Sequence, residues 1–95
     1  MDELDGIRKE IEGIDAKMAA LFTERMRCAF RVAEYKSKNG KPILDAKREA
    51  ALLEKNEKYI TQEELVPYYR QFLKALMDIS KQYQQGIVEE KTKAL

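Results

Sequence analysis

Along the first third of the chain, apolar side chains recur at steps of three and four residues, which is the spacing of one face of an α-helix. Turn signals come only at residues 38–42, where Asn39 and Gly40 can end a helix and Pro42 prevents its continuation. The pattern therefore predicts one long helix from about residue 3 to residue 38. Its apolar positions are Leu4, Ile7, Ile11, Ile14, Met18, Leu21, Cys28, Val32 and Tyr35.

A second, shorter helix is predicted after the extended Pro-Ile-Leu stretch that follows this turn. Asp45 has a side chain suited to the N-cap position, and helix-forming residues continue to about Tyr59. Leu52, Leu53 and Asn56 share one face of this segment. The segment is therefore expected to be a short helix that buries one side.

The third helix has the clearest predicted start. Thr61 and Glu64 have the spacing of a capping box, and Pro67 predicts a short opening turn with a break or kink near residues 63–66. The helix is then expected to reach about residue 88, and the remaining residues to fray. Its apolar face consists of Leu73, Leu76, Met77 and Ile87, flanked by Tyr69, Phe72 and Tyr83.

The length of the first predicted helix implies a partner chain. At 1.5 Å per residue, a helix over residues 3–38 is about 54 Å long, whereas a compact chain of this size has a radius of gyration of about 12–13 Å. The helix would project beyond its own protomer, and its apolar stripe continues almost throughout. We therefore expect a single all-α domain over residues 1–95, with three helices per protomer, in an interlocked homodimer whose long helices pair.

Composition argues against several classes of function. The chain has 18 Lys and Arg against 17 Asp and Glu, a net charge of +1, which is not the one-signed excess typical of nucleic-acid or membrane-surface binding. It has no apolar run of 18 residues and no signal-peptide pattern, so a cytoplasmic protein is expected. The single cysteine, Cys28, cannot form an internal disulfide.

The chain contains no histidine. The commonest general base and the commonest metal ligand are therefore missing, and one cysteine leaves no recognisable zinc site. The four glycines are scattered, so no glycine-rich phosphate loop is predicted. If the protein is an enzyme, its chemistry is expected to need no metal, no cofactor and no covalent nucleophile.

Two cations interrupt the apolar stripe of the first helix. Arg25 continues the heptad step that runs from Leu4 through Met18 to Val32, and Lys36 lies eleven residues further on, within about 20° of the same face. A charge on such a stripe is unfavourable unless it is paired. These side chains therefore either extend to solvent, specify the register of helix pairing, or bind an anionic ligand.

Arg8 lies on a neighbouring line of the same helix, about 25 Å from Arg25 and about 42 Å from Lys36. No metabolite could contact all three side chains within one chain. A crossed or antiparallel second helix could bring Arg8 of another protomer to the other two cations. The predicted dimer and the positions of the cations therefore indicate a site shared by two chains.

Polar side chains also lie on the inward faces of the other two helices. Ser80 and Gln84 are four residues apart on the third helix, and they are either a hydrogen-bonded pair in a bundle or part of a ligand site. Glu49 precedes two leucines by three and four residues, so it also faces inward. Beside it, Arg48 lies in the first turn, where the macrodipole disfavours a cation. These two charges are either solvated or border a site.

Four segments carry a resemblance to one protein family. They are IRKEIEGID (7–15), LFTERMRCAFRVAEYK (21–36), PILDAKRE (42–49) and SKQYQ (80–84). With them, in this order and spacing, the chain resembles the all-helical chorismate mutases over about residues 4–88. The resemblance implies a three-helix protomer in an intertwined dimer with two equivalent sites. It also implies conversion of chorismate to prephenate by an intramolecular Claisen rearrangement, on the route to phenylalanine and tyrosine.

The same resemblance implies a role for each polar residue named above. Arg25 would bind a substrate carboxylate, joined by Arg8 of the second protomer. Lys36 and Gln84 would donate hydrogen bonds to the ether oxygen as its bond to carbon breaks. Ser80 would help to hold the ring carboxylate.

On the second helix, the resemblance implies that Glu49 accepts a hydrogen bond from the ring hydroxyl, with Arg48 beside it. Asp45 would begin the helix and fix the loop that closes over Lys36. A pericyclic reaction of this kind is already unimolecular, which agrees with an inventory that lacks histidine and any metal site.

Two other functions stay open at this point. The polar residues on the stripe could specify register in a non-enzymatic helical dimerisation or interaction module. A nucleic-acid binder is a third alternative, disfavoured by the balanced charge. Whether the chain acts alone or as the mutase part of a longer bifunctional enzyme, and whether aromatic amino acids regulate it, are also left open.

Overall fold

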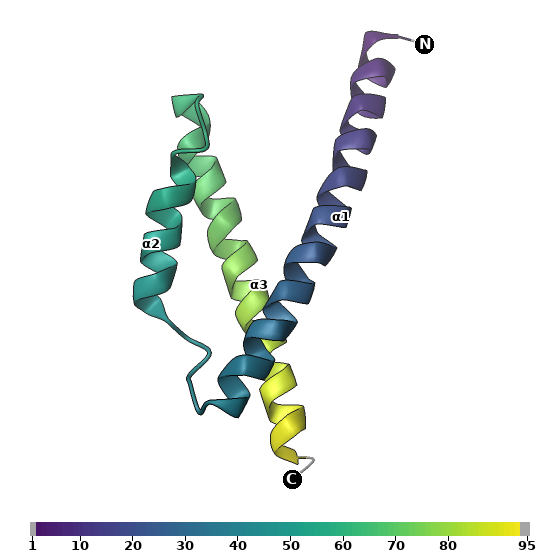
Figure 1. Cartoon of the computed structure of the whole chain (residues 1–95). Helices are drawn as coiled ribbons and strands as arrows, with labels where there is room; N and C mark the ends of the chain where they lie inside the picture. Colours follow the sequence, from purple (N-terminus) through teal and green to yellow (C-terminus); the bar gives the residue numbers. More distant parts are fainter. Residues whose placement is uncertain (1, 94–95) are drawn as a thin grey trace.

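The structure is a computed structural model that describes residues 2–93. Three α-helices follow one another along the chain, α1 (Glu3–Lys38), α2 (Ala46–Glu57) and α3 (Val66–Lys93), and a short 3₁₀ helix, η1 (Glu63–Leu65), leads into the third (Figure 1). All regular structure in this range is helical, so the predicted all-α fold with three helices is confirmed.

Helix α1 ends at the predicted residue, and the predicted residues Asn39 and Gly40 end it. The Asn39 side chain donates to the Tyr35 carbonyl at 2.8 Å, and Gly40 has the positive φ of 63° that favours glycine at this position. The Lys41 amide then donates back to the Lys36 carbonyl at 2.9 Å, as in a Schellman motif. These bonds satisfy carbonyls at the end of the helix and turn the chain towards α2.

The start of α3 differs from the predicted capping box. Gln62, and not Thr61, is the N-cap of η1, and no side chain caps this helix. The Gln62 side-chain amide instead donates to the Glu64 carboxylate at 2.6 Å. The predicted opening turn is confirmed, because η1 precedes α3 and Pro67 lies in the first turn of α3, where a missing amide hydrogen is tolerated. Helix α2 ends at Glu57, two residues before the expected Tyr59.

The prediction of fraying after residue 88 is wrong for residues 89–93. Helix α3 continues to Lys93 because this segment packs against α1. Ile87 is buried, and Lys91 Nζ donates to Glu34 Oε2 on α1 at 3.4 Å. Residues 94 and 95, for which fraying was also predicted, lie outside the described range. The C-terminal turn of α3 therefore helps to hold α1 in place.

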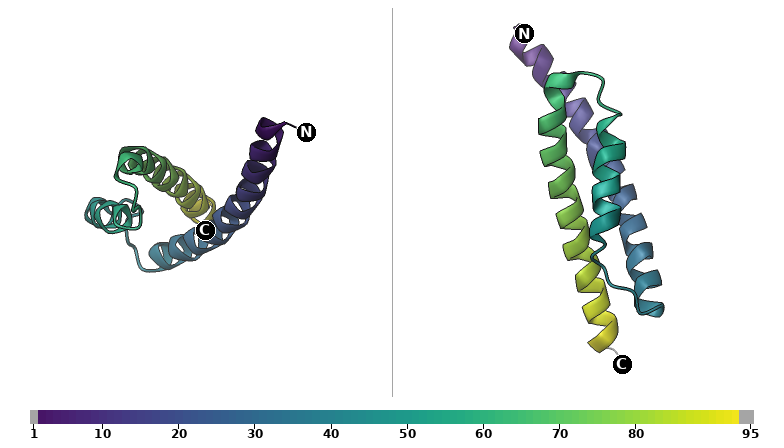
Figure 2. Two further views of the ribbon diagram at one scale, coloured as in Figure 1. Left: turned by 90° about the horizontal axis from the view of Figure 1, so that it is seen from above. Right: turned by 90° about the vertical axis from the view of Figure 1, so that its left-hand side faces the viewer.

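Helix α3 is the central element, and both other helices pack on it. Figure 2 shows that the C-terminal half of α1 crosses α3, while α2 lies along the N-terminal half of α3. Ala29 and Ala33 of α1 are buried at the crossing, where their small side chains allow a close approach. The remaining buried apolar residues are Ile43, Leu73, Met77 and Ile87.

The N-terminal half of α1 extends away from the rest of the chain (Figures 1 and 2). The molecule has a radius of gyration of 17.1 Å and a longest extent of 59 Å, so the predicted projection of the long helix is confirmed. Along this half the apolar stripe is uncovered, with exposed fractions between 45% and 63%. Its members are Leu4, Ile7, Ile11, Ile14, Met18 and Leu21.

Candidate active site

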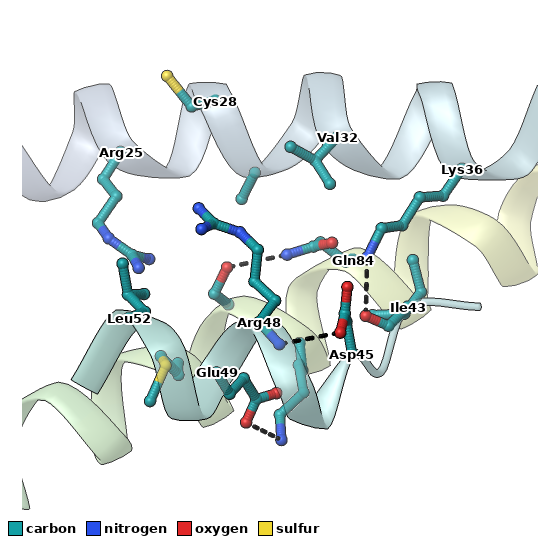
Figure 3. A pocket seen from close by; sticks show the side chains of 14 residues that line it. Arg25, Cys28, Val32, Lys36, Ile43, Asp45, Arg48, Glu49, Leu52 and Gln84 are labelled. Carbon is teal, nitrogen blue, oxygen red and sulfur yellow. Dashed lines mark hydrogen bonds and ion pairs between the residues drawn. The ribbon is translucent and has the colours of Figure 1, made fainter. Parts of the chain in front are cut away.

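A cavity of about 360 Å³ opens between the C-terminal half of α1, the start of α2 and the middle of α3 (Figure 3). This volume is within the range of small-molecule sites, about 300–1,000 Å³. All three helices and the loop between α1 and α2 contribute side chains. The lining residues are Arg25, Cys28, Ala29, Val32, Lys36, Ile43, Asp45, Arg48, Glu49, Leu52, Met77, Ser80, Lys81 and Gln84.

The cavity is cationic. Four lining side chains are positive and two are negative, which gives a net charge of +2 in a chain whose total charge is only +1. Four of these six charged side chains are partly buried, and partial burial strengthens their electrostatic interactions relative to bulk water. The cavity therefore favours a small anion with two negative charges. The charged residues are Arg25, Lys36, Arg48 and Lys81, with Asp45 and Glu49.

Lys36 is held in place by the loop that follows α1. Its Nζ donates to the carbonyl oxygen of Ile43 at 3.0 Å, and Ile43 is buried. Arg25 extends from the same helix, three turns earlier, towards Leu52 of α2 (Figure 3). Both cations are half-buried, so neither simply extends to solvent. An ammonium carries three donor hydrogens, and only one is used by the loop.

The start of α2 places its first-turn charges at the cavity. The Asp45 carboxylate caps the helix by accepting from the Arg48 amide at 3.0 Å, as predicted for this N-cap. Because the helix begins here, the side chains of Arg48 and Glu49 both line the cavity (Figure 3). Arg48 lies in the first turn of α2, where the helix dipole disfavours a cation, and from there its side chain faces α1 across the cavity.

Ser80 and Gln84 are the two buried polar residues of the described chain, with exposed fractions of 7% and 9%. Gln84 Nε2 donates to Ser80 Oγ at 3.0 Å, which confirms that both face inward from α3. The other amide atom, Oε1, is buried without a hydrogen-bond partner. An unsatisfied buried carbonyl costs about 1–3 kcal/mol, so this amide has unused hydrogen-bonding capacity at the wall of the cavity.

Lys81 lines the cavity and was not predicted. Its Nζ lies 3.2 Å from Glu49 Oε1 on α2 and 3.3 Å from Asp78 Oδ1 on its own helix. The pKa of Lys81 is raised, first by the hydrogen bond with Glu49 and then, more weakly, by Asp78. The sequence does contain a signal for this position, because Lys81 follows Met77 by four residues and precedes Gln84 by three.

Arg8 is far from this cavity. It lies on the exposed N-terminal half of α1 and does not line the cavity, whereas the other seven predicted site residues do. The single chain therefore brings together Arg25, Lys36, Asp45, Arg48, Glu49, Ser80 and Gln84. A contribution from Arg8 would have to come from a second chain, and it stays a prediction.

The fold and the cavity define a class of protein: a small helical protein with a cationic cavity between three helices, whose size and charge suit a compact anion. The family model for chorismate mutase type II matches residues 7–85 of this chain. The chain belongs to the chorismate mutase type II family.

Two curated relatives support this assignment. The chain is 38% identical to the bifunctional chorismate mutase/prephenate dehydratase of Aquifex aeolicus (strain VF5), over 85% of this chain and 25% of that protein. It is 41% identical to the protein of the same name from Buchnera aphidicola subsp. Schizaphis graminum (strain Sg), over 57% of this chain and 14% of that protein. The chain thus spans about a quarter or less of the length of these relatives. No solved structure gives a significant match.

None of the helices in the described range has a stretch long and apolar enough to cross a lipid bilayer.

Proposed function

We propose that this chain converts chorismate to prephenate by an intramolecular Claisen rearrangement, in the biosynthesis of phenylalanine and tyrosine. The observation that carries the proposal is a cavity with a net charge of +2, found between the helices of a chorismate mutase type II chain. Chorismate has two carboxylates, so its charge complements that of the cavity. We place the reaction in the cytoplasm and in a single domain.

A unimolecular rearrangement limits what the protein has to supply. No nucleophile or metal ion takes part, so the chain contributes by holding the substrate in its compact reactive conformer. It also contributes by placing hydrogen-bond donors where negative charge develops on the ether oxygen as its bond to carbon breaks. The new carbon–carbon bond forms as the carbon–oxygen bond breaks, and no proton leaves the substrate.

Lys36 and Gln84 are the proposed donors to the ether oxygen. Lys36 is positioned before the substrate arrives, because the Ile43 carbonyl holds its ammonium while two hydrogens stay free. Gln84 Nε2 carries two hydrogens, and one of them is donated to Ser80 Oγ. The second would be free to donate to the ether oxygen, and Ser80 would keep its own hydroxyl hydrogen for the ring carboxylate.

The other polar residues would hold the rest of the substrate. Arg25 would bind one carboxylate with its guanidinium, since a fork of donors fits a carboxylate. Ser80 would help to hold the ring carboxylate. Glu49 would accept a hydrogen bond from the ring hydroxyl, with Arg48 beside it, and Asp45 would fix the loop and the first turn of α2.

The proposal includes an intertwined dimer. Pairing of two α1 helices would cover the exposed apolar stripe on the N-terminal half of each. It would also bring Arg8 of the second protomer to the cavity that contains Arg25. Arg8 would add a further positive charge where the two substrate carboxylates are bound.

Turnover of chorismate by the purified chain tests this function. We expect saturable loss of chorismate with formation of an equal amount of prephenate, without added metal or cofactor. The rival function, a helical interaction module, predicts association of chains without turnover. No turnover at any pH from 4 to 8 would favour that module. The prephenate dehydratase activity named for the relatives is not part of this proposal, because the chain covers 25% and 14% of those two proteins.

A further inference from the structure

Lys81 forms a cross-helix ion pair with a residue to which the proposed function gives a substrate contact. Its ammonium lies 3.2 Å from Glu49 Oε1, and the two residues are 32 positions apart in the chain. Their side chains are only 29% and 25% exposed, so the pair is shielded from solvent more than an ordinary surface pair. Both side chains line the cavity between the three helices.

The ammonium is itself fixed from a second side. Asp78, one turn earlier on α3, accepts from Lys81 Nζ at 3.3 Å. Lys81 therefore contacts one carboxylate on its own helix and one on α2, which restricts the rotamers of a flexible side chain. Among the described residues, Oε1 of Glu49 is engaged in this way, while Oε2 has no hydrogen-bond partner. The carboxylate is thus held by one oxygen and free at the other.

We propose that Lys81 is a positioning residue, whose ammonium holds Glu49 Oε1 so that Oε2 can accept the hydrogen bond from the substrate hydroxyl. This inference rests on the proposed function. Lys81 acts through Glu49 and does not itself contact the reacting atoms. Hydrogen bonding to Glu49 raises the pKa of Lys81, so the ammonium stays charged at any pH at which the protein would work.

Lys81 also supplies part of the charge of the cavity. Without it, the lining side chains would carry a net charge of +1, and a substrate with two negative charges would no longer be balanced within one chain. Two effects are therefore possible in kinetics: orientation of Glu49, which the proposal requires, and direct attraction of the substrate. A double-mutant cycle separates them, because only the first depends on Glu49.

The kinetic test compares Lys81→Met, Lys81→Arg and Lys74→Met. Lys81→Met removes the ammonium and keeps the shape of the stem, and we expect kcat/KM to fall about tenfold, the loss of one charged hydrogen bond. Lys81→Arg keeps the cation and should stay within about threefold of wild type. Lys74→Met is the matched control: Lys74 is exposed on the same helix, two turns earlier and outside the cavity, and its loss should change kcat/KM less than about twofold.

The cycle uses Glu49→Gln as the second change. In that background we expect Lys81→Met to alter kcat/KM less than about twofold, because the residue through which Lys81 acts is already neutral. An equally large loss in both backgrounds would overturn the proposal and would indicate direct attraction of the substrate. Failure of Lys81→Arg to restore activity would also overturn it. Circular dichroism of each variant separates these effects from unfolding.

A titration of the Lys81 side chain by nuclear magnetic resonance tests the pair without any turnover. Glu49→Gln should lower the pKa of Lys81, and Asp78→Asn should lower it less, following the order of the two contacts. An unchanged titration in Glu49→Gln would overturn the pair itself. Absence of chorismate turnover in the wild-type protein would overturn the proposed function together with the substrate contact of Glu49. Normal turnover with independent effects of Lys81 and Glu49 would overturn this inference alone.

Discussion

Lys36 combines a fixed position with unused donor hydrogens, because the Ile43 carbonyl orients its ammonium towards the cavity. If this ammonium stabilises the ether oxygen, its removal affects the transition state more than the bound substrate. We expect Lys36→Ala to lower kcat about 10²–10³-fold, as for loss of one oxyanion-hole donor, while the protein stays folded. Steady-state kinetics with circular dichroism measures both quantities.

Lys38→Ala provides the matched control for that substitution. Lys38 is exposed two residues later on α1 and does not line the cavity, so its loss should leave kcat near the wild-type value. Near-wild-type turnover by Lys36→Ala would contradict the role given to Lys36.

The role of Gln84 as a hydrogen-bond donor can be tested by replacing its amide with a carboxyl group. A glutamine amide donates at every pH, whereas a carboxyl group can donate only when it is protonated. We therefore expect Gln84→Glu to shift activity to acidic pH, with the largest loss near neutral pH. Profiles of kcat against pH from 4 to 8 for both proteins measure the shift. An unchanged profile would exclude Gln84 as a donor.

For single residues, the sequence predicted those site residues whose position follows from periodicity within one helix. Arg25 and Lys36 share a face of α1, and Ser80 and Gln84 share a face of α3, so residue spacing alone was enough to place each pair. Lys81 could not be assigned a role in the same way. Its partner Glu49 is on another helix, and only the packing of α2 on α3 brings the two side chains within 3.2 Å.

Between elements, the ion pair of Arg70 and Glu57 joins the first half of α3 to the end of α2. The hydrogen bond from Arg70 lowers the pKa of Glu57. A carboxyl whose pKa is lowered on folding stabilises the protein above its unfolded-state pKa, and that contribution disappears as the pH falls through the folded-state value. We expect Glu57→Gln to lower the urea midpoint of unfolding slightly at pH 7. At a pH below both the folded-state and the unfolded-state pKa of Glu57, the substitution should not lower it.

Urea unfolding of Glu57→Gln and Glu54→Gln at the two pH values checks this prediction. Glu54 is exposed on the same helix and makes no ion pair among the described residues, so Glu54→Gln should show no such pH dependence. An equal destabilisation by Glu57→Gln at both pH values would mean that its contribution is not ionic.

The elements were predicted well where local signals decide them. The end of α1 depends on Asn39 and Gly40, and the start of α2 depends on Asp45, and both lie where the sequence indicated. The errors come from contacts between distant residues or from competing local partners. The bond of Lys91 to Glu34 extends α3 beyond its expected end, and Gln62 takes the carboxylate of Glu64 that a capping box would use.

For the whole molecule, the exposed stripe on α1 is the feature that a single chain does not explain. Apolar side chains that are half exposed over six helical positions favour association, and a second α1 has the matching pattern. Periodicity could predict this projection because helix length and stripe are local properties. The geometry of the dimer could not be derived, since it depends on contacts between chains.

The most direct test of a catalytic site shared by two chains mixes two inactive variants. Arg8→Ala and Lys36→Ala are unfolded together and refolded at equal amounts. In a mixed dimer, one cavity carries both changes and the other carries neither. Random pairing makes about half of the dimers mixed, so the mixture should regain about one quarter of the wild-type activity.

Lys36→Ala mixed with Gln84→Ala is the matched control, because each change then damages the cavity of its own chain and no intact cavity can form. We expect that mixture to stay at the mean activity of its two variants. Recovery of about one quarter of wild-type turnover by the Arg8→Ala and Lys36→Ala mixture, and not by the control, is the predicted result. No recovery in the first mixture, with wild-type protein refolded in the same way fully active, would contradict the shared site.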